Sequence, residues 1–237
     1  MKYLKAIISD LWMYLFGGKG ELSSLKRSTA IVREAHLSSQ VCQMLRERID
    51  RVILEEKHEY IWKDSCGSDT RILCFEKFIP DLVANLNIEK LISSADQYTG
   101  RKTKSWFLMA NRLVPKEGNK GSGGGLHRDS AYSHQVKFIW YLSNVDLDQG
   151  PFQYLPGSNG SSFLNPRQYP IGQTRYKNVN APLTRVLGKE GDLLICDTRC
   201  IHGGKPISSG VRYAVTLYTF PDPLGTRKIL TRSGFLL

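Results

Sequence analysis

The sequence predicts a mainly β protein with some α-helix, in which a largely helical N-terminal part precedes a barrel or double-sheet jelly roll. Between residues 101 and 222, short β-prone runs alternate with Gly/Pro turns, which is typical of such folds. In residues 1–100 the apolar residues recur mostly at helical spacing. With 237 residues, 41% of them hydrophobic, the chain can bury one sizeable core. We therefore expect a single domain over residues 1–237.

Three helices and one strand are expected in the first hundred residues. The first helix lies within residues 1–16, and its apolar stripe consists of Leu4, Ile7, Ile8, Leu11, Trp12 and Leu15. We expect this stripe to pack on the core, with peripheral contact to a membrane surface as the weaker alternative. Ser38 and Ser39 can cap a second helix. Residues 71–78 have β character, and a third helix over residues 81–97 should end at Gly100.

The β region is punctuated by turns and by two long polar segments. We expect strands at residues 105–110, 136–142, 152–155, 184–187, 192–197 and 211–220. Residues 116–125 are rich in Gly and lack apolar side chains, which predicts a mobile loop. Residues 161–182 are polar and irregular. Residues 116–125 and 161–177 are candidate lids over a site.

The net charge of +11 comes from scattered Lys and Arg residues. The chain has no run of four or more cations and no zinc-finger or RNA-binding signature, so we do not expect a nucleic-acid partner. We interpret this charge as a solvated basic surface and keep an anionic substrate as the more specific, weaker alternative.

Five cysteines without a CxxC pair indicate a reducing compartment, and we expect a cytoplasmic protein. Cys196 and Cys200 lie near His202 in the sequence, so a second metal site is conceivable, although buried packing thiols are more common. The apolar run near the N-terminus is too short to span a bilayer, so no transmembrane segment is expected.

The most informative pattern is His127-Arg128-Asp129, followed much later by His202. On an extended strand, residues two apart point to the same side, so His127 and Asp129 can face one centre. His202 follows a buried strand and precedes Gly203-Gly204, which lets other groups approach closely. Two imidazoles and one carboxylate with open positions form the facial triad of non-haem Fe(II) oxygenases.

Arg212 would lie on the strand after His202 and supply a fixed cation for the distal carboxylate of a keto-acid cosubstrate. Each residue alone has a commoner structural role, because a single His is usually a hydrogen-bonded residue and a strand Arg usually faces solvent. His134 is the nearest further histidine. An ordinary loop position is its expected role, and a position beside the substrate or behind the ligands is the weaker alternative. The conjunction of the four residues carries the prediction.

With these motifs the chain resembles the phytanoyl-CoA dioxygenase family of Fe(II)/2-oxoglutarate-dependent oxygenases. The resemblance covers roughly residues 105–220. Its motifs are LHRDS at 126–130, YLSNVD at 141–146, QGPF at 149–152, LPGSN at 155–159, GDLL at 191–194, and HGG at 202–204 with Arg212. The chain departs from the usual family pattern at Ile139, Asn159 and Gly204.

The resemblance implies a double-stranded β-helix, a cupin-like jelly roll, with His127, Asp129 and His202 as iron ligands and Arg212 as the 2-oxoglutarate anchor. It also implies that O2 and 2-oxoglutarate give succinate and CO2 while a substrate C–H bond is hydroxylated, and it allows ascorbate as an accessory reductant. Asn111 and Tyr141 are further candidate cosubstrate contacts. Because Asp129 is present, hydroxylation is favoured over halogenation, in which relatives lack the carboxylate.

The sequence leaves the substrate open. Basic residues expected around the mouth of the site are Arg128, Arg167, Arg175, Arg199 and Lys205, which motivates the hypothesis of a small anionic substrate. Two rival interpretations remain: a jelly-roll metal protein that needs no keto acid, and a non-catalytic basic binding module for nucleic acid or acidic membranes. A buried Arg212 without an anionic partner would be costly, which argues against the first. Intact metal ligands argue against the second.

Overall fold

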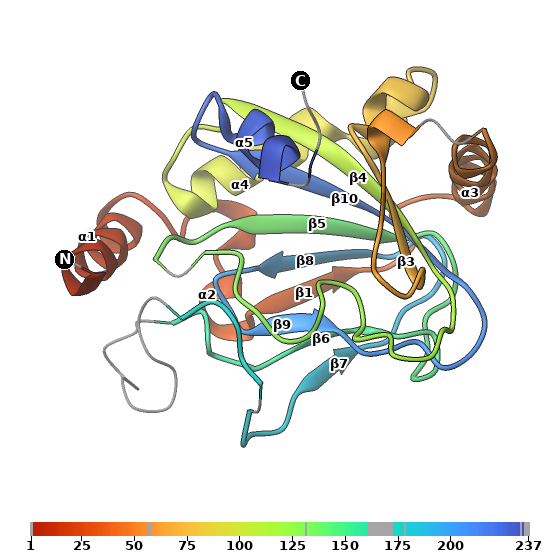
Figure 1. The fold of residues 1–237 in the computed structure, drawn as a ribbon. Helices are drawn as coiled ribbons and strands as arrows, with labels where there is room; N and C mark the ends of the chain where they lie inside the picture. Colours follow the sequence, from red (N-terminus) through yellow and green to blue (C-terminus); the bar gives the residue numbers. More distant parts are fainter. Residues whose placement is uncertain are drawn as a thin grey trace.

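The computed structural model describes residues 2–55, 58–130, 132–160, 173–177, 179–232 and 234. In this part of the chain the strands form a seven-stranded sheet of order β1-β8-β5-β10-β4-β3-β2 and a three-stranded sheet of order β7-β6-β9. Figure 1 shows the large sheet across the middle of the molecule, with β9, β6 and β7 below it. All pairings are antiparallel. The predicted mainly β, double-stranded β-helix fold is confirmed.

The strands differ from the predicted ones mainly before residue 100. Their bounds are β1 Ala30–Arg33, β2 Ile61–Lys63, β3 Asp69–Leu73, β4 Ser105–Leu113, β5 Val136–Tyr141, β6 Phe152–Tyr154, β7 Thr184–Val186, β8 Leu193–Asp197, β9 His202–Gly204 and β10 Arg212–Phe220. Three of them come from the segment where one strand was expected. The expected strand at 71–78 is too long, because Cys74 takes a positive φ of 53° and a 3-10 turn, Phe75–Phe78, follows.

The helices are α1 Lys2–Leu15, α2 Leu25–Ser28, α3 Ser39–Leu54, α4 Ile88–Thr99 and α5 Gly225–Arg232. Short 3-10 turns are Gly20–Leu22, His58–Tyr60, Phe75–Phe78 and Val83–Leu86. The Ser38 side chain caps α3 by accepting a hydrogen bond from the Val41 backbone, and Gly100 ends α4 at φ 67°, both as predicted. The third helix starts later than expected because Asn87, in a left-handed conformation, separates it from the turn before it.

Alternation along the central strands separates a core face from a cavity face. On β5, Phe138 and Trp140 pack with residues of α3 and α4 in the main hydrophobic core. Their neighbours Lys137, Ile139 and Tyr141 point to the opposite face and line a cavity between the sheets. Helices α3 and α4 therefore cover one face of the large sheet. The other face lines the cavity, and Leu230 of α5 packs at its edge against Phe107 and Met109.

The expectation that α1 packs its apolar stripe on the core is wrong. A different face of α1 packs on the protein: Ala6, Ser9 and Met13 are buried. The stripe residues are at least 37% exposed. Figure 1 shows α1 to one side of the sheets. None of the helices in the described residues is long and apolar enough to cross a membrane.

Candidate metal centre

His127, Asp129 and His202 come together at the edge of the small sheet. His127 forms an isolated antiparallel bridge with His202, in which each backbone N–H donates to the other carbonyl oxygen at 2.8 Å. This pairing places the two imidazole rings side by side, with centroids 4.4 Å apart. The Asp129 backbone N–H donates to the Thr198 carbonyl at 3.2 Å, which holds the carboxylate next to both rings.

One potential ligand atom from each of the three residues lies within 4.8 Å of the others. The distance from His127 Nε2 to Asp129 Oδ1 is 3.6 Å, and that from His202 Nε2 to Asp129 Oδ2 is 3.5 Å. Within the described residues this is the one group of three or more such side chains close enough to hold a metal ion.

The other ring nitrogens orient the imidazoles. His127 Nδ1 lies 2.9 Å from the Gly125 carbonyl oxygen, and His202 Nδ1 lies 3.0 Å from the Cys200 carbonyl oxygen. A carbonyl only accepts, so each Nδ1 carries the proton and each Nε2 presents its lone pair to the common centre. Backbone carbonyls hold metal-binding histidines in this way in many proteins.

The electrostatics keep Asp129 and His202 in the protonation states that bind a cation. Burial lowers the pKa of His202 to about 3, so its ring is neutral at physiological pH. Burial alone would raise the pKa of Asp129, but the ammonium of Lys137 and the two imidazoles outweigh it and hold that pKa well below its usual range. The centre therefore combines the ionised carboxylate of Asp129 with the neutral imidazole of His202.

Lys137 is a component of the site that sequence reasoning missed. Its Nζ lies 2.7 Å from Asp129 Oδ2 and 4.3 Å from the centroid of the Tyr218 ring. Burial lowers the pKa of Lys137, but the Asp129 carboxylate more than offsets this and raises it overall. Period-two alternation from Ile139 and Tyr141 was the signal that would have placed Lys137 on the cavity face.

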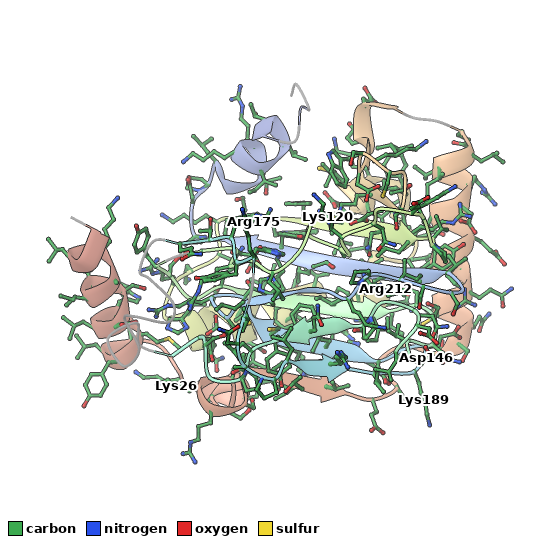
Figure 2. The ribbon with its side chains drawn as sticks, turned by 60° about the horizontal axis from the view of Figure 1, so that its bottom comes forward. Lys26, Lys120, Asp146, Arg175, Lys189 and Arg212 are labelled. Atoms are coloured by element: carbon green, nitrogen blue, oxygen red, sulfur yellow. The ribbon has the colours of Figure 1, made fainter. Side chains whose placement is uncertain are left out.

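Arg212 lies at the start of β10, is 5% exposed and lines the same cavity. Figure 2 shows it inside the molecule, whereas Lys26, Asp146 and Lys189 lie at the edge. Its Nη1 donates to the Gly150 carbonyl, while its buried Nε has no hydrogen-bond partner within the described residues. Burial lowers the pKa of Arg212. A buried guanidinium with an unused N–H fits an anion that completes its hydrogen bonding.

The cavity between the sheets has a volume of about 680 Å³. Asn111 on β4 and Tyr141 on β5 both line it, as do the three triad residues and Arg212. The Tyr141 hydroxyl donates to the Val186 carbonyl and accepts from the Phe152 backbone N–H, both at 3.1 Å. Tyr141 must release Val186 before it can donate to a cosubstrate, so its role there stays a prediction.

The Gly-rich loop at 116–125 packs directly on the candidate metal centre. A side-chain carbon added at Gly123 would lie 2.3 Å from the His127 ring, and one at Gly204 would lie 2.7 Å from the Ser122 backbone nitrogen. The Gly204 N–H donates to the Ser122 carbonyl at 2.8 Å. The close approach that the sequence suggested for Gly203-Gly204 is made by this loop.

Other predicted residues lie elsewhere. His134 Nδ1 is 2.5 Å from Asp197 Oδ2, and its Nε2 is 2.8 Å from Arg199 Nη1, so it belongs to a network outside the cavity. Cys196 and Cys200 pack in a small hydrophobic cluster, with their sulfurs 3.7 Å apart. The second metal site is thus not formed by the described residues.

The expected ring of cations around the mouth needs correction. Arg199 is fully buried and its guanidinium binds Asp10 of α1. Arg128 lines the cavity, but its guanidinium donates to the Tyr176 hydroxyl and the Arg199 carbonyl. Lys205 donates to the Leu147 carbonyl. Arg175 does line the cavity, as expected. Arg167 and the candidate lid residues 161–172 lie outside the described residues.

Two further cations that the sequence analysis missed line the cavity. Lys120 comes from the Gly-rich loop, and Arg71 comes from β3, a strand that sequence patterning placed only approximately. Arg71 pairs with Asp69 at 2.6 Å and lies 4.8 Å from the Trp62 ring centroid. Figure 2 shows Lys120, Arg175 and Arg212, the three labelled cavity cations.

Fold and site together define a jelly-roll protein with a two-histidine, one-carboxylate centre. Residues 30–214 match the family model described as phytanoyl-CoA dioxygenase (PhyH). The chain therefore belongs to the phytanoyl-CoA dioxygenase family. No curated protein matches the sequence.

Several solved structures share the fold at low sequence identity. The epimerase SnoN from nogalamycin biosynthesis, described as non-haem and α-ketoglutarate-dependent, is 16% identical with a TM-score of 0.63, covering 83% of this chain and 80% of its own. HygX from Streptomyces hygroscopicus, solved with nickel and 2-oxoglutarate, is 16% identical with a TM-score of 0.58 and coverages of 83% and 84%. EvdO2 from Micromonospora carbonacea var. aurantiaca is 15% identical with a TM-score of 0.59 and coverages of 86% and 94%.

Proposed function

We propose that this protein is an Fe(II)/2-oxoglutarate-dependent oxygenase that hydroxylates an unactivated C–H bond of a small, anionic metabolite. The observation that carries the proposal is the convergence of two Nε2 atoms and one carboxylate within 4.8 Å, in a cavity that also contains the buried, incompletely bonded Arg212. Family membership supports it. So do SnoN, solved with Fe3+ and α-ketoglutarate, and HygX, solved with nickel and 2-oxoglutarate.

The donor set fits a divalent iron. Two imidazoles and one carboxylate supply three ligands and leave half of an octahedron open. When bound, iron with 2-oxoglutarate and O2 supplies the oxidising power, with succinate and CO2 as the other products. The protein's own contribution is to keep both Nε2 lone pairs and the Asp129 carboxylate aimed at one point before the metal arrives.

Arg212 orients the cosubstrate in this proposal. A guanidinium pairs well with the distal carboxylate of a dicarboxylic keto acid, which would use the Nε–H that now lacks a partner. Fixing both ends of the keto acid restricts it to one orientation and sets the direction from which the substrate is attacked. The same contact argues against a keto-acid-independent jelly-roll protein, because Arg212 would then stay buried without an anion.

The proposal also specifies which reaction the enzyme catalyses on its substrate. SnoN is described as an epimerase and SnoK, also from nogalamycin biosynthesis, as a carbocyclase, so the fold also serves other reactions. We propose hydroxylation, because Asp129 occupies the position that halogenases of this type leave free for chloride, and hydroxylation is the simplest remaining outcome.

Succinate release across pools of small metabolites tests this function. Wild-type protein with Fe(II), 2-oxoglutarate and O2 is expected to release succinate in a substrate-dependent way and to add one oxygen atom to the product. His127→Ala should abolish turnover, and Arg212→Ala should mainly raise the KM for 2-oxoglutarate. Turnover that persists in His127→Ala, or that needs no keto acid, would refute the proposal.

The cavity cations support an anionic substrate. Lys120 and Arg175 line the cavity near its Gly-rich edge, where the Arg175 guanidinium donates to the Gly123 carbonyl. Arg175→Gln is expected to raise the KM for the substrate about tenfold. This increase corresponds to the loss of one charged contact that contributes about 1.4 kcal/mol to binding. Arg185→Gln, on the exposed β7, is the matched control. Equal KM values for the two variants would remove the anionic substrate from the proposal.

We also propose that the protein works in the cytoplasm. All five cysteines are free, and Cys196 and Cys200 remain unbonded although their sulfurs are 3.7 Å apart. Free thiols at this separation are typical of a reducing compartment. Fractionation of cells that express the chain, followed by immunodetection, tests this proposal, and recovery outside the cytoplasm would overturn it.

A further inference from the structure

Helix α1 presents its apolar side chains to the outside of the molecule. Eight large side chains from Leu4 to Phe16 are between 37% and 80% exposed: Leu4, Ile7, Ile8, Leu11, Trp12, Tyr14, Leu15 and Phe16. A helix on a globular protein normally buries such a stripe. A contiguous apolar surface of this kind marks an interaction site.

The helix is nevertheless attached to the body in a defined way. Ala6, Ser9 and Met13 face the protein, and Asp10 binds the fully buried Arg199 guanidinium. At the far end, the Trp12 indole N–H donates to the Gly100 carbonyl at 3.1 Å. These contacts fix which face of α1 points outward, so the exposed stripe follows from how the helix is anchored.

Positive charge surrounds the stripe. Lys5 lies on α1 itself and is exposed. The Arg101 guanidinium lies 5.6 Å from the Trp12 ring centroid, and the exposed Lys26 side chain lies against Gly18, just beyond the end of α1. The acid on the described part of the helix, Asp10, is already paired with Arg199. The whole chain carries a net charge of +11.

We infer that α1 binds the surface of an anionic lipid bilayer, lying in the interface with its apolar face among the headgroups and outer acyl carbons. Apolar and aromatic residues on one face with flanking cations are the features of interfacial helices. Each nearby Lys or Arg adds attraction to anionic lipids. This inference is independent of the proposed oxygenase chemistry.

A second copy of the chain fits the same surface less well. A 14-residue helix is about 21 Å long and about 10 Å wide, so its outer face is far smaller than the roughly 800 Å² per partner of a stable interface. Two copies would also bring two strongly positive molecules together. A bilayer needs no matching protein area and carries the opposite charge.

Co-sedimentation with vesicles tests the inference. The wild-type chain is expected to bind vesicles of phosphatidylcholine with 30% phosphatidylserine, and to bind pure phosphatidylcholine and high-salt samples at least tenfold more weakly. Ile8→Gln/Leu11→Gln/Leu15→Gln should reduce binding at least tenfold, and Trp12 fluorescence in the wild type should shift to the blue on binding. These residues are more than half exposed, so helicity and Tm are expected to be unchanged.

The matched control carries three substitutions at exposed leucines away from α1: Leu54→Gln/Leu147→Gln/Leu187→Gln. It should bind vesicles like the wild type. Equal losses in the two triple variants, equal binding to neutral vesicles, or no binding to either kind of vesicle would overturn the inference. So would a lipid-free dimer, seen by light scattering, that the α1 substitutions dissociate.

Discussion

At the residue scale, the buried ammonium of Lys137 and any bound cation share one carboxylate. Lys137 is 7% exposed and its Nζ lies 2.7 Å from Asp129, so in the metal-free protein it is a close cationic partner of that carboxylate. Removing one partner of a buried ion pair leaves the other uncompensated. Bound metal would take over part of this role.

Lys137→Met is therefore expected to destabilise the metal-free protein by about 1–3 kcal/mol in urea unfolding, because the Asp129 carboxylate that it leaves keeps some contact with solvent. Lys189→Met removes an exposed lysine and should change stability by less than about 0.5 kcal/mol. Saturating Ni2+ should recover part of the loss in Lys137→Met. Equal stability of the two metal-free variants would show that the ion pair contributes nothing.

His202 gives the metal-free protein a specific dependence on pH. Its pKa is about 3 when folded and near 6.5 when unfolded, so between these values the unfolded chain binds more protons. Stability contributed by neutral His202 is complete above pH 6.5 and falls by up to about 1.4 kcal/mol per pH unit as the pH drops toward 3.

Urea unfolding of metal-free wild type and His202→Gln between pH 4.5 and 7 measures this effect. As the pH falls, the free energy of unfolding should decrease more steeply for the wild type than for His202→Gln. The stability of the wild type relative to the variant should therefore decrease with acid. Parallel curves would mean that His202 is not held neutral by burial.

The sequence was sufficient to predict that four particular side chains lie together at the cavity. His127, Asp129, His202 and Arg212 stand out because residue types with matching chemistry recur at spacings that a jelly roll brings together. Lys137 was not predicted, because a lone strand lysine normally faces solvent and its buried ion pair depends on facing Asp129 across the sheets.

At the scale of elements, the Gly-rich loop and β9 are built around close backbone contact. Gly121 and Gly118 both have φ 76°, but a side-chain carbon at Gly121 would lie 2.0 Å from the Gly204 carbonyl oxygen, whereas one at Gly118 meets nothing within 4 Å. An alanine at either position would have the same backbone strain. Only an alanine at Gly121 would also overlap with a neighbouring atom, so comparing the two variants isolates the steric effect.

Gly121→Ala is expected to cost about 1–3 kcal/mol more than Gly118→Ala, because the loop must move off β9. The same displacement should weaken metal affinity in Gly121→Ala, since this loop packs on His127. Thermal unfolding and Ni2+ titration measure both effects. Indistinguishable variants would show that the loop is not held against β9.

Elements whose ends carry capping or stop residues were predicted well. Short elements that lack such a sequence signal were missed. The Ser38 cap and the Gly100 stop follow from local chemistry. β1 and β2 have four and three residues, too few for a periodic pattern, and they exist because β8 and β3 offer free edges. α1 was periodic, but periodicity alone does not say which way its apolar face points.

At the scale of the whole molecule, the large sheet draws strands from both sides of residue 100. β3 pairs with β4, and β1 pairs with β8 across more than 150 residues of chain. The helical part and the jelly-roll core that the sequence suggested thus share one sheet. We propose on this basis that the chain is a single cooperative domain.

Calorimetry should show one unfolding transition with equal calorimetric and van't Hoff enthalpies. A fragment of residues 101–237 should fail to fold, because it lacks three strands of the large sheet and α3 and α4, which cover that sheet. Two separate transitions, or a folded fragment, would contradict a single domain.

The central claim is that His127, Asp129, His202 and Arg212 together hold iron and 2-oxoglutarate. Anaerobic titration of the protein with Fe(II) and 2-oxoglutarate tests it most directly, by the weak visible charge-transfer band of the keto acid bound to iron. The band should appear in the wild type, be absent in His127→Ala, and need much more 2-oxoglutarate in Arg212→Ala. No band in the wild type, or an unchanged band in His127→Ala, would contradict the claim.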